Sequence, residues 1–338
     1  MPTIEFRGEL IRKGVMSSCI VKTKMGNTDP VVKECIDLVK KFFEHGIVKL
    51  LGAKLVYIVH GYKGNVEKPW LKDLTNNLME RYKNHRIVVG IVSWEEGAKL
   101  LYPSPTAVHY PVAAVNTWPV GNVLAYVTDN LAKNVPEKKI SAICIGHSLG
   151  AHLCGFFGKM LKKLKPTIRL DKIIGLDPAG PIFENAQQDP NLRLEKNDAT
   201  HTEIIHTNTK RYGFTKPIGH ADIFVNGGSK QPACPTISLN VQCSHRYGYH
   251  FMVELAKPPQ GGRQCTAHWK CDSKEYQKLA AVTKEDKTRL KDAGCVMQQP
   301  NKVLRIGDLD IKGNMKEGVF WVEASKESET CKFPTTKR

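Results

Sequence analysis

The chain has 338 residues, of which 41% are hydrophobic and 25% are charged. That is enough apolar material to bury a sizeable core, so the composition excludes a wholly disordered protein. The formal net charge of +17 favours attraction to anionic partners, either a lipid surface or nucleic acid. Because no basic helix with interleaved aromatic residues stands out, we expect an anionic lipid surface and no nucleic acid, with a soluble basic enzyme as the alternative.

Apolar strands alternate with helical patterns after a first stretch, residues 1–30, that gives no clear signal. The sequence predicts strands at 54–62, 86–94, 139–145 and 172–177, and helices at 69–83, 110–134 and 153–164. This alternation predicts an α/β fold with a mostly parallel central sheet flanked by helices and a site at the carboxyl ends of the strands. Since the sequence shows neither an internal repeat nor a low-complexity linker, one domain over 1–338 is the simplest division.

The ten cysteines show neither a C-x-x-C motif nor a zinc-binding spacing with histidine. Disulfide bonds and an oxidising compartment are therefore the better interpretation, and we expect secretion. Cys144 and Cys154 fall on a predicted strand and the helix after it, so they could instead be buried thiols. The first residues lack the charged and apolar regions of a signal peptide, so a leader is either removed or missing from this sequence. No apolar run approaches the length of a membrane span, which leaves peripheral membrane contact.

Residues 146–150 read Gly-His-Ser-Leu-Gly and lie between a predicted strand and a predicted helix. A G-x-S-x-G motif in this context is typical of a nucleophile elbow, in which glycines allow a sharp turn that presents the serine hydroxyl. The alternative is a glycine-rich turn whose serine caps the helix. The strand before the motif and the helix after it favour Ser148 as a nucleophile.

A serine hydroxyl is a weak nucleophile at neutral pH unless a histidine accepts its proton and a carboxylate orients that histidine. Along the chain of α/β hydrolases the order is serine, acid, histidine. Asp177 closes the strand that follows the Ser148 helix, which brings it to the same sheet edge, whereas Asp171 lies at the wrong end of that strand. The Asp177-Pro178 pair could alternatively do no more than start a turn.

Six histidines follow this aspartate, and the residues alone do not choose firmly among them: His201, His206, His220, His245, His250 and His268. His245 is the best candidate, since it lies just after Cys243, where a disulfide could hold an otherwise mobile base. His206 follows two isoleucines and is more typical of a buried strand end. His220 could form a structural bond with Asp222.

Acyl transfer also needs backbone N–H donors for the oxyanion of the tetrahedral intermediate. One is expected from Leu149, the residue after the proposed nucleophile, and the second from a loop that follows an early strand. The sequence His60-Gly61-Tyr62 is the matching loop, so we expect Leu149 and Tyr62 to form the oxyanion hole.

Several of these segments occur together, and in the same order, in the pancreatic lipase family. They are 60–62, 110–121, 146–152, 175–181, 220–228 and 243–245. The chain resembles this family over a core of about 51–331. The resemblance implies an α/β-hydrolase fold, a triad of Ser148, Asp177 and His245, and a disulfide between Cys234 and Cys243.

The segment from Cys234 to Cys243 corresponds to the lid of this family. It holds eight residues between the cysteines, where lid-bearing triglyceride lipases carry a much longer segment. Ile237, Leu239 and Val241 alternate along this short lid and could dip into a lipid surface or simply pack on the domain.

Other features also distinguish branches of the family. The connection 207–217 is short, and no lipid-binding β-sandwich is expected after the catalytic domain. With the short lid, this pattern resembles the phospholipase A1 branch, including its basic secreted and venom forms. The calcium-site segment of the family is only partly matched, by Arg193, Glu195 and Asp198, so we expect no required metal and no cofactor.

The sequence therefore predicts a secreted serine carboxylic ester hydrolase, a phospholipase A1 that releases the sn-1 fatty acid through an acyl-enzyme. One alternative is a triacylglycerol lipase or galactolipase with the same triad. A second alternative is a catalytically silent lipase-like storage or binding protein. The expected partner is a phospholipid at a membrane or micelle surface, contacted peripherally by a monomer without a transmembrane segment.

Overall fold

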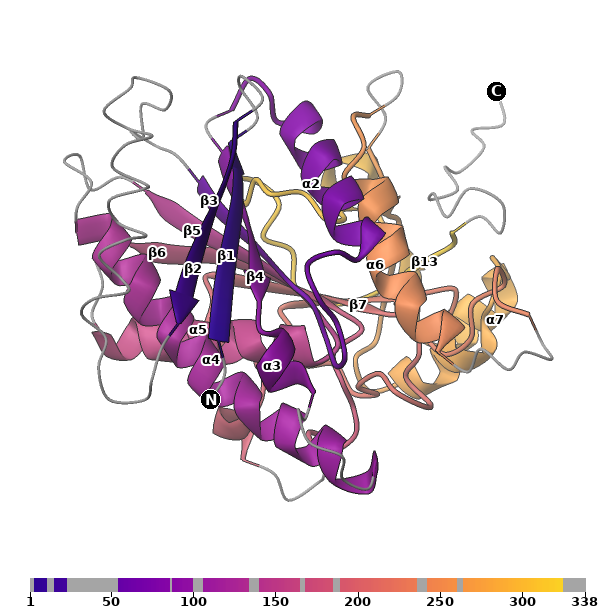
Figure 1. Cartoon of the computed structure of the whole chain (residues 1–338). Helices are drawn as coiled ribbons and strands as arrows, with labels where there is room; N and C mark the ends of the chain where they lie inside the picture. The colour runs from indigo at the N-terminus through magenta and orange to yellow at the C-terminus, as the bar shows by residue number, and fades with distance from the viewer. Residues whose placement is uncertain are drawn as a thin grey trace.

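A computed structural model describes residues 3–10, 15–22, 54–85, 87–99, 106–133, 140–164, 168–184, 189–235, 242–259 and 264–324 (Figure 1). Within these ranges the chain forms an eleven-stranded sheet in the order β11-β10-β13-β8-β7-β6-β5-β3-β4-β1-β2. Helices lie against both faces of this sheet.

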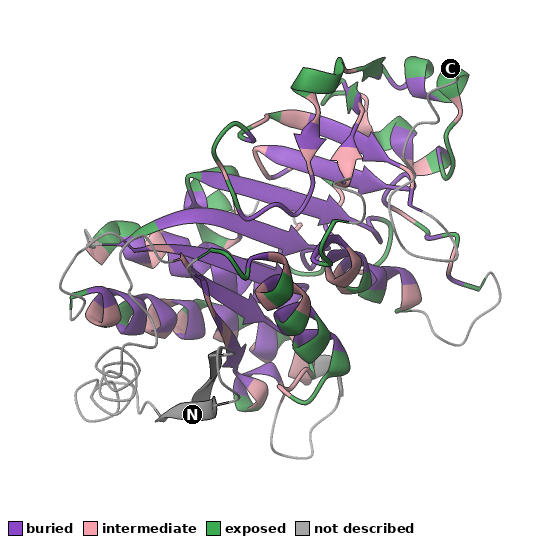
Figure 2. Cartoon of the chain, turned by 90° about the horizontal axis from the view of Figure 1, so that it is seen from above, coloured by how far each residue is buried: buried purple, intermediate pink, exposed green. Residues whose placement is uncertain are grey.

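The seven strands in the middle of the sheet run parallel to their neighbours. They are β3 (Lys54–Val59), β4 (Ile87–Ser93), β5 (Ser141–His147), β6 (Arg169–Leu176), β7 (His201–His206), β8 (Ala221–Val225) and β13 (Gly318–Val322). Most of their residues are buried, as expected for parallel strands that are covered on both faces (Figure 2).

Antiparallel strands extend the sheet at both edges. These strands are β1 (Thr3–Leu10) and β2 (Val15–Lys22) beyond β4, and β10 (Trp269–Cys271) and β11 (Val296–Met297) beyond β13. A separate two-stranded sheet pairs β9 (Thr266–Ala267) with β12 (Leu304–Arg305).

The helices divide into two layers. The described helices are α2 (Pro69–Arg81), α3 (Glu95–Ala98), α4 (Thr106–Lys133), α5 (Leu149–Leu164), α6 (Cys243–Leu255) and α7 (Lys287–Asp292). Short 3-10 helices are η1 (Pro190–Leu192), η2 (Lys196–Asp198), η4 (Tyr276–Ala281) and η5 (Pro300–Lys302). Helices α4 and α5 cover one face of the parallel strands, and α2 and α6 cover the other (Figure 1).

Strand β3 shows how one short sequence serves both layers. Tyr57 packs edge-on against Phe157 of α5, while its neighbour Ile58 packs in the opposite cluster with residues of α2 and α6. Because successive side chains of a strand point to opposite faces, an unbroken apolar run is what a doubly covered strand requires.

The C-terminal third forms a third apolar cluster around β10, η4 and α7. A disulfide between Cys271 and Cys295 lies within this cluster. The bond closes a loop of the chain, so it limits the freedom of the unfolded state as well as joining β10 to the segment before β11.

The predicted fold class is confirmed: the parallel sheet with helices on both faces is an α/β-hydrolase arrangement. The sequence missed the antiparallel edges, because β1 and β2 fall in the stretch 1–30 that showed no clear pattern, and β10 and β11 are very short. Among the described helices, none is both long and apolar enough to cross a bilayer.

Candidate active site

Ser148 lies at the sharp turn between β5 and α5, with a positive φ of 57°. Such a backbone is strained for a residue with a side chain and costs about 1–3 kcal/mol. Close packing of glycines around it sustains the turn. A Cβ on Gly146 would lie 2.3 Å from the Gly150 carbonyl oxygen, and a Cβ on Gly150 would lie 2.5 Å from the Val59 oxygen. The two glycines therefore permit the turn itself and also the close approach of β5, α5 and β3 to one another.

The Ser148 hydroxyl is the first member of a hydrogen-bonded chain of three side chains. His245 Nε2 lies 2.8 Å from Ser148 Oγ, and His245 Nδ1 lies 2.5 Å from Asp177 Oδ2. With the carboxylate accepting from Nδ1–H, the remaining nitrogen Nε2 is free to accept the serine proton. The structure thus brings together the three residues that the sequence predicted as a triad.

Asp177 follows the last residue of β6 and is fully buried. Its Oδ1 accepts hydrogen bonds from the backbone N–H groups of Thr207, at 2.8 Å, and Asn208, at 2.9 Å. Two backbone donors and the imidazole satisfy the carboxylate and fix its direction. Gly213 packs so closely on it that a Cβ there would lie 2.4 Å from Oδ1.

The predicted oxyanion donors lie beside the serine. Among the residues that the structure describes, the backbone N–H groups of Leu149 and Tyr62 donate to no protein acceptor. Gly61 brings the Tyr62 loop against the elbow, because a Cβ on Gly61 would lie 2.8 Å from Ser148 Cβ. Stabilisation of a tetrahedral oxyanion requires N–H groups that are not already bonded, so these two groups suit that role, and the oxyanion hole stays a prediction.

His60 and Trp94 hold this loop, and the sequence reasoning did not assign them a role. The rings stack at a centroid distance of 5.7 Å; Trp94 Nε1–H donates to the His60 carbonyl, and His60 Nε2 accepts from the Trp94 N–H. Burial lowers the pKa of His60 to about 4, so the ring stays neutral and able to accept this bond. Trp94, which directly follows β4, was the feature of the sequence that could have indicated this contact.

His147 is a second contact that the sequence did not reveal. Its Nε2–H donates to the carbonyl oxygen of His245 at 3.0 Å, and the two rings lie 4.7 Å apart. Burial, together with the nearby His245, holds the pKa of His147 well below its ordinary value. The neutral ring therefore ties the elbow to the first turn of α6.

Two other histidines were interpreted from the sequence, and the structure agrees with one of these interpretations. His206 ends β7 in the core, as expected, but it is the partner of Asp222, with Nε2 at 2.8 Å from Oδ1. The possibility that His220 bonds Asp222 is not realised, because His220 Nδ1 instead accepts from the Thr202 N–H at 3.0 Å.

Ser148 opens onto a cleft of about 820 Å³. Five aromatic side chains line it: Tyr62, Trp70, Tyr110, Tyr212 and Tyr249. Such a wall suits an extended apolar group such as an acyl chain, with the reacting hydroxyl at the floor.

The disulfide between Cys234 and Cys243 is confirmed, and Cys243 begins α6, two residues before His245. Cys144 and Cys154 form a second disulfide between β5 and α5, so the alternative that they are buried thiols is wrong. The predicted lid residues Ile237, Leu239 and Val241 lie outside the described residues.

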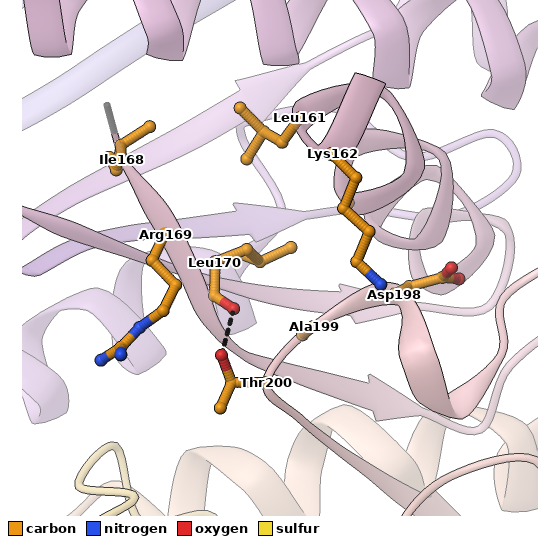
Figure 3. A pocket seen from close by; sticks show the side chains of 9 residues that line it. Leu161, Lys162, Ile168, Arg169, Leu170, Asp198, Ala199 and Thr200 are labelled. Atoms are coloured by element: carbon orange, nitrogen blue, oxygen red, sulfur yellow. Dashed lines mark hydrogen bonds between the residues drawn. The ribbon is translucent and has the colours of Figure 1, made fainter. Parts of the chain in front are cut away.

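The segment of Arg193, Glu195 and Asp198 does not fit a metal site. Lys159 Nζ lies 2.5 Å from Asp198 Oδ1 and 3.9 Å from Glu195 Oε1, so an ammonium group already pairs with both carboxylates. The Arg193 guanidinium packs over Phe214. Asp198 also lines a separate hollow of about 420 Å³, with Lys162 and Thr200 (Figure 3).

A parallel sheet covered on both faces, with a serine at a strand-turn-helix junction, defines an α/β hydrolase. The model of the family named Lipase matches residues 48–284, and the chain belongs to this family. It is therefore a carboxylic ester hydrolase.

Proteins with similar sequences agree with this family assignment. A phospholipase A1 of Vespula squamosa is 35% identical, over 70% of this chain and 75% of its own. A phospholipase A1 of Vespa crabro is 31% identical, over 82% of each chain. Pancreatic lipase-related protein 2 of Cavia porcellus is 30% identical over 64% of this chain, which spans 47% of that protein. Among solved structures, a sugar hydrolase of Lactococcus lactis aligns with a TM-score of 0.29 at 11% identity, over 47% of this chain and 63% of its own.

Proposed function

We propose that this protein is a secreted phospholipase A1, which hydrolyses the sn-1 ester of phospholipids through an acyl-enzyme on Ser148. The observation that carries the proposal is the hydrogen-bonded chain Ser148–His245–Asp177 at the floor of the aromatic cleft. A serine that lines the cleft and whose hydroxyl is hydrogen-bonded to an oriented imidazole has the geometry for attack on a bound ester.

In the proposed reaction, His245 Nε2 takes the Ser148 proton as Oγ attacks the ester carbonyl carbon. The negative charge moves to the carbonyl oxygen, where the Leu149 and Tyr62 N–H groups receive it. Asp177 stabilises the imidazolium, which then gives its proton to the departing alkoxide of the lysophospholipid as the ester C–O bond breaks. Water next attacks the acyl-enzyme, with His245 as base, and the fatty acid leaves as Ser148 regains its proton.

Two observations favour a phospholipid over a triacylglycerol. Only eight residues separate Cys234 from Cys243, whereas lid-bearing triglyceride lipases of the family carry a much longer segment at this place. The two wasp relatives named phospholipase A1 are also matched over most of their lengths. Secretion is supported by the three described disulfides, because such bonds persist in oxidising compartments.

Replacement of the nucleophile tests the mechanism. We expect Ser148→Ala to lower kcat/KM on phosphatidylcholine by at least about 10⁴-fold without unfolding the protein. Ser141→Ala is the matched control, since Ser141 begins the same strand, roughly 20 Å from Ser148. Near-normal turnover by Ser148→Ala would overturn the assignment, and stoichiometric labelling of Ser148 by an organophosphonate would exclude a silent binding protein.

Substrate class and regiospecificity need a separate assay. With a phospholipid that carries different acyl chains at sn-1 and sn-2, we expect release of the sn-1 chain, measured by mass spectrometry. Parallel assays on triolein address the alternative, and a strong preference for triolein would replace phospholipase by triacylglycerol lipase.

A further inference from the structure

The charged residues of the cleft are all basic. Among the residues that the structure describes, sixteen line it, and these include Lys63, Lys68 and Arg246 but neither aspartate nor glutamate. All three cations are exposed, and within the described residues none of them forms an ion pair with a carboxylate. Other surface lysines, such as Lys83 and Lys257, are paired with a glutamate three residues away. The cleft rim therefore carries positive charge without an internal counter-ion.

These cations come from two segments next to catalytic residues: Lys63 and Lys68 lie in the connection between β3 and α2, and Arg246 lies in the first turn of α6. Lys63 directly follows the proposed oxyanion donor Tyr62, and its ammonium lies 5.3 Å from the centre of the Tyr62 ring. Arg246 directly follows His245, and its guanidinium donates to Gln242 Oε1 at 3.0 Å. Lys68 precedes the first residue of α2, whose amino end adds to the positive potential.

From this arrangement we propose that Lys63, Lys68 and Arg246 bind the phosphodiester of the substrate head group while Ser148 attacks the acyl ester. The inference rests on the proposed function and names the residues that make it selective for phospholipids. In a glycerophospholipid the phosphate lies only a few bonds from the sn-1 ester, so both groups fit within one cleft. A guanidinium provides paired N–H donors that match phosphate oxygens, and two ammonium groups add charge.

The positive rim does not repel neutral lipids, but it makes no ionic contact with them. It should therefore change the rate of phospholipid hydrolysis relative to that of neutral lipids. A phosphodiester gains charge-assisted hydrogen bonds that a diacylglycerol lacks. Phosphatidylcholine and phosphatidylglycerol each carry one phosphodiester charge, but the three basic residues repel the choline cation, so we expect phosphatidylglycerol to be the better substrate.

Short-chain substrates separate head-group binding from attraction to a bilayer. Dihexanoyl phosphatidylglycerol, dihexanoyl phosphatidylcholine and dihexanoylglycerol are compared below their critical micelle concentrations, where each is a monomer. We expect Arg246→Gln to lower the ratio of kcat/KM on phosphatidylglycerol to kcat/KM on dihexanoylglycerol by roughly 10-fold, mainly through KM. The triple variant K63Q/K68Q/R246Q should lower it further, and Arg246→Lys should retain part of the preference.

Lys162→Gln is the matched control, since it removes one exposed cation at the far end of α5, about 20 Å from Leu149, beside the separate hollow (Figure 3). The ratio should not change in this variant. An unchanged ratio in the triple variant, or an equal fall in Lys162→Gln, would overturn the inference. The inference would also be overturned by variants that no longer sediment with phosphatidylglycerol vesicles but keep the wild-type kcat/KM ratio on monomeric substrates. The cations would then bind the bilayer surface and not the head group in the cleft. Wild-type protein that cleaves dihexanoylglycerol but neither phospholipid would instead contradict the proposed function itself.

Discussion

Two histidine–aspartate pairs each include one residue at the carboxyl end of the neighbouring strands β6 and β7, yet their surroundings differ. In the first, Asp177 follows β6 and pairs with His245, whose second nitrogen faces a hydroxyl at the floor of a cleft. In the second, His206 ends β7 and pairs with Asp222, but its second nitrogen lies 3.0 Å from the Phe214 carbonyl and its ring stacks on Phe224 in the core. A histidine–aspartate pair thus becomes useful for catalysis through what its other nitrogen can reach.

The largest expected effect follows from breaking the first pair. Asp177→Asn should lower kcat by about 10⁴-fold, because an amide that donates to Nδ1 leaves His245 in the wrong tautomer to accept the Ser148 proton. The measurement is kcat on a soluble ester, with circular dichroism to show that the fold is retained. A loss of less than tenfold would mean that Asp177 is not the orienting carboxylate.

Breaking the second pair should instead affect stability. Asp222→Asn removes a buried carboxylate that accepts from His206 and from the N–H groups of Ile218 and Gly219. We expect about 3 kcal/mol of lost stability in urea unfolding, typical of a broken buried charged network, while the folded fraction keeps its kcat. A specific loss of kcat at full stability would assign this pair to catalysis and remove the contrast.

The sequence could predict the elbow and the aspartate of the triad because a local motif and strand order determine them. Gly146 to Gly150 and the aspartate that closes the next strand need only neighbouring residues to be interpreted. From the residues alone the sequence favours His245 over His206 but does not choose firmly among the six histidines, and the family resemblance assigns His245 to the triad. The sequence could not reveal the contact from His147 to the His245 carbonyl, because a bond across 98 positions depends on how α6 packs on the sheet.

Acid should destabilise the protein through buried neutral histidines outside both pairs. Burial lowers the pKa of His60 to about 4 and of His152 to about 3, below the ordinary 6.5. The unfolded chain therefore binds more protons as the pH falls below 6.5, so stability is present at neutral pH and is lost on acidification. For His60 alone the loss is about 2 kcal/mol between pH 7 and pH 5. Urea unfolding at both pH values measures the slope.

His152→Gln sharpens this prediction. His152 Nε2–H donates to the Ala179 carbonyl, and glutamine can keep that donor without titrating. The variant should show a smaller fall in stability below pH 5 than the wild type, whatever its absolute stability. An identical slope would mean that His152 is not one of the groups that take up protons on unfolding.

The smallest effect concerns how firmly the first pair is held. His147→Phe keeps an aromatic ring against His245 but removes the N–H that donates to the His245 carbonyl. Because one buried hydrogen bond contributes about 1 kcal/mol, we expect kcat on a soluble ester to fall roughly fivefold to tenfold, with little change in KM. His147→Gln, which restores a donor, should recover much of the loss. If His147→Phe instead raises KM and His147→Gln does not restore activity, the ring acts as part of the cleft wall and the orientation of His245 depends on Asp177 alone.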